Sequence, residues 1–312
     1  MADVLISEFM DKGVADELIG EFDVHWDPDL WSKRDELLDR VAKAKAIVVR
    51  NATQVDPKLL DAAPRLKVVA RMGVGLDNID VEACKARGVE VCPSIGANAV
   101  SVAEYVIASA MILLRGPAYY ATKDVAAGAW DRPKFAGATE IAERTMGIVG
   151  FGSIGQVVGE KARGMGMNVI AYDAVMPDGH PAWETARRVS LDDLVAEADV
   201  ISLHCPKLPE TIDLIDARQL GRMKSEAVLI NSARGGIVNE AACAAALRAG
   251  EIAGAALDTL DVEPIQPEVG KLFQGIENLI LTPHIAGVTR DSNRRIAEVA
   301  AENVRRVMAS SV

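Results

Sequence analysis

Cysteine is scarce in this chain, and its spacing excludes several chemistries. The 312 residues include four cysteines, and no two of them form a C-x-x-C pair. Closely spaced cysteines are the usual ligands of structural zinc and the usual partners in redox disulfides. We therefore expect buried free thiols in a reducing compartment. The four residues are Cys84, Cys92, Cys205 and Cys243.

The sequence also lacks a basic block, a long apolar run and an N-terminal targeting signal. The net charge is −11 with no run of five like charges, so the surface is expected to repel nucleic acid and anionic lipid. The most apolar segment, around Ala99–Leu114, is interrupted by Ser101, Glu104 and Ser109 and falls short of a membrane span. The first residues have no basic region followed by an apolar stretch. We expect a cytoplasmic protein without nucleic-acid or membrane partners.

Histidine, the usual acid–base group near neutral pH, occurs only four times. His25 is expected to pack near the surface, and His180 lies in a polar loop. His204 and His284 each follow an expected strand, and loops at the carboxyl ends of parallel strands line ligand crevices. The residues alone do not decide between these two. No cluster has the spacing of metal ligands, so no metal is expected.

The chain does contain a glycine-rich turn between an apolar strand and a helical pattern. Gly147–Gly155 reads G-I-V-G-F-G-S-I-G. In a dinucleotide site Gly150 permits the tight turn, Gly152 lets the backbone approach a pyrophosphate, and Gly155 lets the helix pack on the strand. The helix N-terminus offers N–H groups and a positive dipole end to the phosphates.

Asp173 indicates which dinucleotide is bound. It follows a second apolar run, eighteen residues past Gly155. A carboxylate there accepts hydrogen bonds from ribose hydroxyls and repels a 2′-phosphate, whereas NADP sites place an Arg nearby. Ala174–Pro177 contains no basic group, and Arg187 and Arg188 are expected at a solvated helix end. The sequence therefore predicts NAD.

Two series of alternating strands and helices predict two parallel-sheet domains. Strands are expected at Val4–Ile6, Ala46–Val49, Lys67–Ala70 and Val89–Val91, and then at Met146–Val149, Val169–Tyr172, Val200–Leu203, Val228–Asn231, Gly254–Leu257 and Leu279–Leu281. The helical pattern of Arg290–Met308 lies beyond the last strand and is free to return to the first domain. We expect an outer domain of residues 1–97 and 288–312, an inserted dinucleotide domain of residues 98–287, and a substrate cleft between them.

Two further polar residues follow strands of the second series. Arg234 precedes two glycines, so its guanidinium has few bulky neighbours, and its rigid fork suits a carboxylate. Glu263 follows the next strand, and its spacing does not show whether it reaches a histidine. The alternative interpretations are that Arg234 is a solvated surface charge and that Glu263 is an ordinary acidic residue of a loop.

Several segments occur together and in a fixed order. They are Arg71–Asp80, Asn98–Glu104, Gly128–Trp130, Phe135–Gly137, Gly150–Gly155, Leu203–Pro206 with Thr211, Asn231–Gly236, Asp258–Pro264 and Thr282–Gly287. As a set they resemble the D-isomer-specific 2-hydroxyacid dehydrogenase family over nearly the whole chain. The resemblance implies an α/β fold of two doubly wound parallel-sheet domains, with a Rossmann NAD-binding domain inserted into a smaller flavodoxin-like substrate domain.

The resemblance also implies a role for each candidate residue. His284 would be the acid–base group, Glu263 its orienting partner, and Arg234 the clamp on the substrate's carboxylate and 2-oxo group. The backbone N–H groups of Val74 and Gly75 would bind the carboxylate from the outer domain. The expected cofactor-binding residues are Gly150, Gly152, Ser153, Ile154, Gly155, Asp173, His204, Pro206, Thr211, Ala233, Gly287 and, at the nicotinamide carboxamide, Asp258.

The implied activity is reversible hydride transfer between NAD and C2 of a small anionic D-2-hydroxy acid. Ala2–Met10 resembles the start of bacterial sulfolactate dehydrogenases, so sulfolactate joins 3-phosphoglycerate, glycerate and lactate as candidate substrates. Two alternatives share the architecture: an NAD-responsive corepressor-like binding protein and a phosphite dehydrogenase.

The resemblance further suggests a homodimer formed through the NAD domains. The contact is expected at Asn98–Leu114 and at Ala118–Ala129, where Tyr119 and Tyr120 add to an unusually apolar surface. Packing within one chain is the alternative. Because the chain ends soon after its last helix, no C-terminal regulatory domain is expected.

Overall fold

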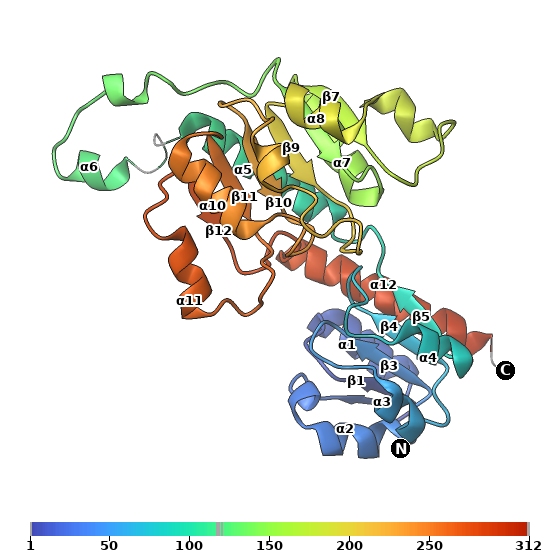
Figure 1. The fold of residues 1–312 in the computed structure, drawn as a ribbon. Coiled ribbons are helices and arrows are strands. Elements are labelled where there is room, and N and C mark those ends of the chain that lie inside the picture. The colour runs from blue at the N-terminus through green and yellow to red at the C-terminus, as the bar shows by residue number, and fades with distance from the viewer. Residues whose placement is uncertain (1, 117–118, 120, 311–312) are drawn as a thin grey trace. The chain divides into compact units, whose positions relative to one another are not determined.

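The chain folds into two compact units. A computed structural model describes residues 2–116, 119 and 121–310. One unit comprises Met1–Asn98 with Val288–Val312, and the other comprises Ala99–Gly287. Each unit is built on its own parallel β-sheet (Figure 1).

The first unit contains a five-stranded sheet in the order β2-β1-β3-β4-β5. All four pairings are parallel, and this doubly wound order is the flavodoxin-like one. Every residue of β1 and β3 is buried, as expected for short apolar strands covered on both faces. The strands are β1 (Val4–Ile6), β2 (Val24–Trp26), β3 (Ala46–Val49), β4 (Val68–Arg71) and β5 (Glu90–Pro93).

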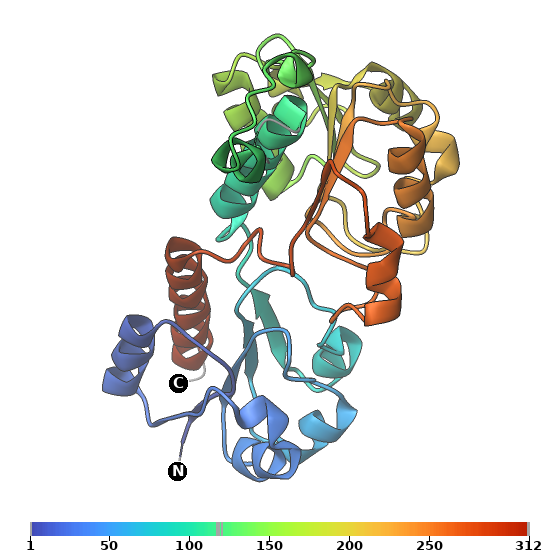
Figure 2. The same ribbon diagram turned by 90° about the vertical axis from the view of Figure 1, so that its left-hand side faces the viewer.

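Helices from both ends of the chain cover this sheet. On one face α1 (Lys12–Glu21) and α12 (Arg290–Ala309) pack against Val4, Ile6 and their neighbours (Figure 2). The opposite face, which carries Leu5 and Ile47, is covered by α2 (Arg34–Val41), α3 (Pro57–Ala62) and α4 (Val81–Ala86). The last helix therefore does return to the sheet formed by the first hundred residues.

The second unit contains a seven-stranded sheet in the order β12-β11-β10-β9-β6-β7-β8. Its pairings are also parallel, and the reversal between β6 and β9 is the switch point of a Rossmann fold. The strands are β6 (Thr145–Val149), β7 (Asn168–Tyr172), β8 (Arg187–Arg188), β9 (Val200–Leu203), β10 (Val228–Asn231), β11 (Gly254–Leu257) and β12 (Leu279–Leu281).

Two apolar cores lie on the two faces of this sheet. One joins α5 (Ala99–Arg115) and α7 (Ser153–Gly164) to β6, and the other joins α8 (Leu191–Glu197), α9 (Ala217–Leu220) and α10 (Glu240–Ala249) to β9 and β10. Two smaller helices are α6 (Thr122–Ala126) and α11 (Pro267–Gly270). The expected fold class, with two parallel α/β sheets, is confirmed.

Two short strands were not expected from the sequence, and one of them corrects an interpretation. Arg187 and Arg188 form β8 at the edge of the second sheet instead of ending a helix. Their side chains are held locally, because Arg187 pairs with Glu197, and Arg188 pairs with Asp178 and lies over the Trp183 ring. The other unexpected strand is β2. The ten predicted strands are present to within a few residues.

All four cysteines are free thiols, and burial raises the pKa of Cys243 to about 12.

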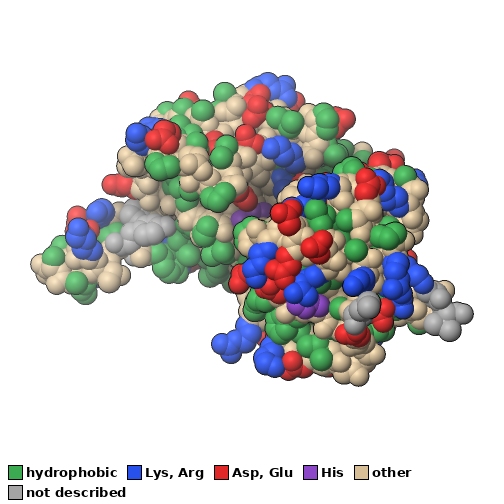
Figure 3. All heavy atoms as spheres, turned by 90° about the horizontal axis from the view of Figure 1, so that it is seen from below, with side chains coloured by type: hydrophobic (Ala, Val, Ile, Leu, Met, Phe, Trp, Pro, Cys, Tyr) green, Lys and Arg blue, Asp and Glu red, His purple; other side chains and the backbone are tan. Residues whose placement is uncertain are grey.

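On the face shown in Figure 3, Asp and Glu side chains lie among Lys and Arg side chains. Among the described residues, none of the helices combines the length and apolarity needed to cross a bilayer.

The glycine turn brings three backbone segments very close together. Gly150 has a φ of +89°, and a Cβ on it would lie 2.7 Å from the backbone nitrogen of Cys205. A Cβ on Gly155 would lie 2.2 Å from the carbonyl oxygen of Gly150. Gly152 is different, because a Cβ there would meet no atom within 4 Å.

This contrast predicts different stabilities for two alanine variants. Gly155→Ala should lower the free energy of unfolding by about 1–3 kcal/mol, because the backbone must shift to admit the methyl group. Gly152→Ala is the matched control and should change it by less than about 0.5 kcal/mol. Denaturant unfolding of the cofactor-free proteins measures both, and equal stabilities would contradict the packing described.

Candidate active site

His284 lies in the loop that follows β12. Its backbone N–H donates to the carbonyl oxygens of Asp258, at 2.8 Å, and of Thr282, at 3.0 Å. Its φ is +56°, a left-handed conformation that is uncommon for a residue with a side chain. The surrounding contacts therefore hold this backbone in a form that the residue alone does not favour.

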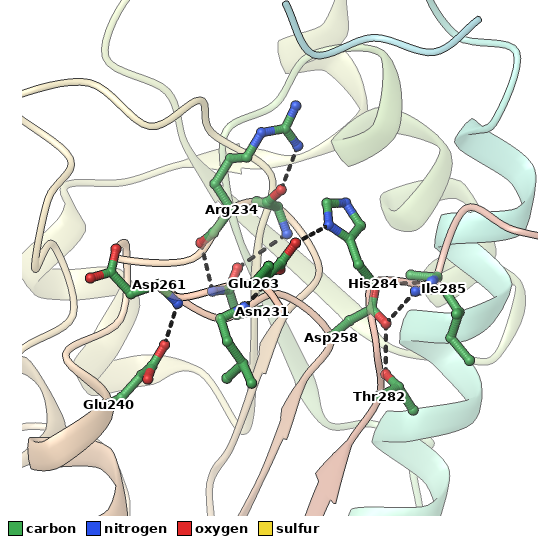
Figure 4. A network of polar contacts seen from close by, with 12 residues as sticks. Asn231, Arg234, Glu240, Asp258, Asp261, Glu263, Thr282, His284 and Ile285 are labelled. Carbon is green, nitrogen blue, oxygen red and sulfur yellow. Dashed lines mark hydrogen bonds and ion pairs between the residues drawn. The ribbon is translucent and has the colours of Figure 1, made fainter. Parts of the chain in front are cut away.

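The His284 side chain faces a carboxylate. Its Nδ1 lies 2.8 Å from Oε2 of Glu263 (Figure 4). The other oxygen of Glu263 accepts from the backbone N–H of Leu260 at 3.0 Å, which fixes the carboxylate's orientation. The two side chains are 49% and 39% exposed, so solvent reaches both. The question that spacing left open is answered: Glu263 does reach a histidine.

Arg234 is placed by the loop that follows β10. The buried Asn231 side chain donates to the carbonyl oxygen of Arg234 at 2.9 Å and accepts from the N–H of Ala233 at 3.1 Å. A Cβ on Gly235 would lie 1.9 Å from the carbonyl oxygen of Leu260, so only glycine permits this approach. In Figure 4 the guanidinium of Arg234 and the imidazole of His284 both extend away from the strands.

A set of polar contacts braces the loop that carries Glu263. The Asp261 N–H donates to Glu240 at 2.6 Å, and the Asp261 carboxylate pairs with Lys207 at 2.7 Å. Burial raises the pKa of the Glu240 carboxyl. The sequence analysis assigns no role to Asn231 or to Glu240. Asn231 is a polar residue at the end of an apolar strand, and this position could have indicated that it belongs to the site.

Asp258 is the most enclosed acid in the site, at 1% exposure. One oxygen accepts from the Thr282 hydroxyl at 2.6 Å and from the Ile285 N–H at 2.8 Å. The other accepts from the Ala286 N–H at 2.9 Å. A carboxylate offers about four acceptor positions, so one position on the second oxygen remains.

At the glycine turn, Asp173 is held by three backbone N–H groups. One oxygen accepts from Phe151 at 2.8 Å, and the other from Val175 and Met176 at 3.0 and 2.9 Å. Gly152 caps α7 without any side-chain acceptor for the first-turn N–H groups. A dinucleotide site requires open space at the turn, N–H donors at a helix N-terminus for the phosphates, and a carboxylate at the end of the next strand for the ribose. Gly152, the start of α7 and Asp173 supply these three features.

His204 differs from His284 in its surroundings. Its Nε2 lies 2.8 Å from the hydroxyl of Ser202, a fully buried residue, and its buried Nδ1 has no partner among the described residues. Burial lowers the pKa of His204 to about 3. A group that stays neutral at working pH is a poor proton donor. Thr211 closes the adjoining loop by bonding Pro206 and Leu208.

Val74 and Gly75 lie in the first unit, in the loop that follows β4. Both are partly exposed, and their backbone N–H groups donate to no atom of residues 2–116, 119 or 121–310. Adjacent unpaired N–H groups at the carboxyl edge of a sheet are able to bind an anion. No group of His, Cys, Asp and Glu side chains within the described ranges is arranged to hold a metal ion.

Comparison with known proteins identifies the family. Residues 107–286 match the NAD binding domain of the D-isomer specific 2-hydroxyacid dehydrogenases. The (S)-sulfolactate dehydrogenase of Chromohalobacter salexigens is 45% identical over 99% of both chains. This chain belongs to the D-isomer specific 2-hydroxyacid dehydrogenase family.

Two further relatives show how broad the similarity is. The D-3-phosphoglycerate dehydrogenase of Mycobacterium leprae is 40% identical over 98% of this chain, which spans 57% of that protein. A D-lactate dehydrogenase from Aquifex aeolicus, solved with NAD and lactic acid, superimposes with a TM-score of 0.82 at 27% identity, covering 98% of this chain and 96% of that one.

These findings establish the class of reaction and the cofactor. The chain is an NAD-dependent oxidoreductase of hydroxy acids. The corepressor and phosphite dehydrogenase alternatives are not favoured, since the relatives reported above are named as hydroxy-acid dehydrogenases.

The low pKa of His204 gives a prediction about its protonation. Its imidazole nitrogen shifts in an NMR titration should stay those of the neutral ring between about pH 5 and pH 9. Below about pH 6.5 the unfolded chain takes up a proton at His204, whereas the folded chain does not until the pH nears 3. The free energy of unfolding therefore decreases as the pH falls from about 6.5 toward 3. Titration of His204 near pH 6.5 would contradict the burial.

Proposed function

We propose that this protein is an NAD-dependent (S)-sulfolactate dehydrogenase in which His284, Glu263 and Arg234 act on the substrate. The choice of sulfolactate rests on the 45% identity with the Chromohalobacter protein over 99% of each chain. The roles rest on the 2.8 Å contact between His284 and Glu263, with Arg234 on the adjoining loop. 3-Phosphoglycerate, glycerate and lactate are the competing substrates. A D-configured sulfolactate takes the S label because sulfur changes the priority order.

In the proposed reaction, hydroxy acid and NAD become oxo acid and NADH with release of one proton. NAD supplies the acceptor for the hydride that leaves C2. Neutral His284 removes the hydroxyl proton in oxidation, and protonated His284 returns it in reduction. Glu263 holds Nδ1, so the outward-facing Nε2 is the atom that exchanges the proton. Positioned acid–base groups of this kind contribute roughly 10²–10⁴-fold to the rate.

Substrate recognition is assigned to Arg234 and to two backbone N–H groups. The guanidinium binds the carboxylate and polarises the 2-oxo group, and the N–H groups of Val74 and Gly75 bind the carboxylate. On a chain with a net charge of −11, such local donors supply the attraction that the overall charge does not. Residues 1–97 and 288–312 form the substrate domain in this proposal, and residues 98–287 form the NAD-binding domain.

The cofactor is assigned to the carboxyl edge of the second sheet. Asp173 accepts from the adenosine ribose, the N-terminus of α7 binds the pyrophosphate, and Asp258 uses its remaining acceptor position for the nicotinamide carboxamide. Support comes from the open space at Gly152 and the uncapped first turn of α7. The other proposed contacts are Gly150, Ser153, Ile154, Gly155, His204, Pro206, Thr211, Ala233 and Gly287.

We also propose a cytoplasmic homodimer formed through the NAD domains, with residues 98–114 and 118–129, the segment around α6, at the contact. Figure 1 shows α6 on a long excursion from the second sheet, and the helix has no buried residue. Trp130 is 80% exposed, Tyr119 56% and Val125 46%. A five-residue helix without a core is marginal in water, so contact with a second copy accounts for it best. Tyr120 and Ala118 lie outside the described residues.

The catalytic assignment predicts the behaviour of single variants. His284→Ala should lower kcat about 10²–10⁴-fold and leave NADH affinity within about threefold, because the imidazole acts on the substrate oxygen. Arg234→Lys should raise KM and lower kcat, since lysine keeps the charge but loses the fork. Steady-state kinetics with (S)-sulfolactate, 3-phosphoglycerate, glycerate and lactate, with NADH fluorescence titration, measure these effects.

His180→Ala is the matched control and should behave as wild type, because His180 only caps a short helix. Sulfolactate should have the highest kcat/KM of the panel. A preference for another acid would overturn the substrate assignment, and wild-type turnover by His284→Ala would overturn the roles.

The dimer predicts a change in sedimentation. The wild-type protein should sediment as a dimer at micromolar concentration, and Val125→Asp combined with Trp130→Asp should give a monomer, because charge is poorly tolerated in an apolar interface. Ile19→Asp, at a similarly exposed residue of α1, should remain dimeric. A monomeric wild-type protein would rule the proposal out.

A further inference from the structure

The left-handed backbone of His284 requires a restraint, and Asp258 supplies most of it. The carbonyl oxygen of Asp258 accepts from the His284 N–H, and its carboxylate accepts from the next two N–H groups, at Ile285 and Ala286. Three consecutive N–H groups therefore converge on one residue. The direction of the His284 side chain follows from where the Asp258 carboxylate is held.

The Asp258 carboxylate is held from the other side by a chain of hydroxyls. Thr282 donates its single hydroxyl proton to Asp258 at 2.6 Å. The Tyr105 oxygen lies 2.7 Å from the same Thr282 oxygen, so Tyr105 must be the donor in that contact.

Tyr105 is well suited to be the fixed end of this series of hydrogen bonds. It lies on α5, whose neighbouring residues Val102, Ala103 and Val106 are buried in the core of the second unit. Burial raises the pKa of Tyr105, so the phenol keeps its proton, and remains a donor, through the neutral and mildly alkaline range. The anchor is thus both rigid and constant in charge.

We propose that Tyr105 is a positioning residue for the reaction, acting through Thr282 and Asp258 to hold His284 in its left-handed conformation. This inference rests on the proposed role of His284. Tyr105 hydrogen-bonds neither His284 nor Glu263, and its effect passes through two hydrogen bonds with a fixed direction. Donation into the Thr282 oxygen orients that hydroxyl and strengthens its own donation to the carboxylate.

Four variants test the chain of contacts. Tyr105→Phe should lower kcat about three- to tenfold, with KM and the NADH dissociation constant within about twofold of wild type. Thr282→Val should lower kcat by at least as much, whereas Thr282→Ser keeps the hydroxyl and should restore most of it. The double variant Tyr105→Phe with Thr282→Val should be no slower than Thr282→Val alone, because the two residues act in series.

A second readout needs no substrate or cofactor. Hydrogen exchange of the Ile285 and Ala286 N–H groups should be faster in Tyr105→Phe and in Thr282→Val, since both N–H groups donate to the carboxylate that these residues hold. Tyr172→Phe is the matched control, because that hydroxyl bonds no atom of the described residues, and it should change neither exchange nor kcat.

The outcomes separate this proposal from the proposed function. If His284→Ala is inactive while Tyr105→Phe has wild-type kcat and exchange, the positioning role is overturned and the role of His284 stands. Additive losses in the double variant, or no restoration by Thr282→Ser, would likewise overturn it. If His284→Ala is fully active, the proposed function itself fails, whatever Tyr105 does.

Discussion

The geometry of the site depends on the hydrogen bonds that surround the buried carboxylate of Asp258. Removing a charge from water is very costly unless donors surround it, and here two backbone N–H groups and one hydroxyl do so. Because those donors lie in the loop that follows β12, that loop has little freedom to follow another path. His284 is carried by the same loop, so an interaction that satisfies one charge also directs a second side chain.

The sheet explains why these groups meet. Asn231 ends β10, Asp258 follows β11 and Thr282 follows β12, three adjacent parallel strands whose carboxyl ends lie at one edge. Within the sheet, polar groups would be buried without partners, so the polar residues begin where the strands end. Segments more than fifty residues apart in sequence therefore supply one site. Side chains placed at the ends of a rigid sheet keep their geometry better than those on a long loop.

Much of this could be predicted from the sequence, and what was missed has a physical cause. Apolar runs and the glycine turn are local signals, so the strands and the Gly150–Gly155 turn were predictable. The short strands β2 and β8 have weak apolar patterns and were not. The contact between Tyr105 and Thr282 joins residues 177 positions apart and depends on the direction of two side chains. Pattern and spacing carry no information about such a contact.

Two carboxylates in the site have opposite surroundings, which suits them to different work. Asp258 is enclosed and bound by donors that do not move, so it holds structure. Glu263 is 39% exposed, with one oxygen on the Leu260 N–H and the other on the imidazole. Its charge is therefore fixed in position while water still reaches the pair. In the proposed reaction His284 gains and loses a proton in each turnover, and an ion pair sealed from water would resist that change.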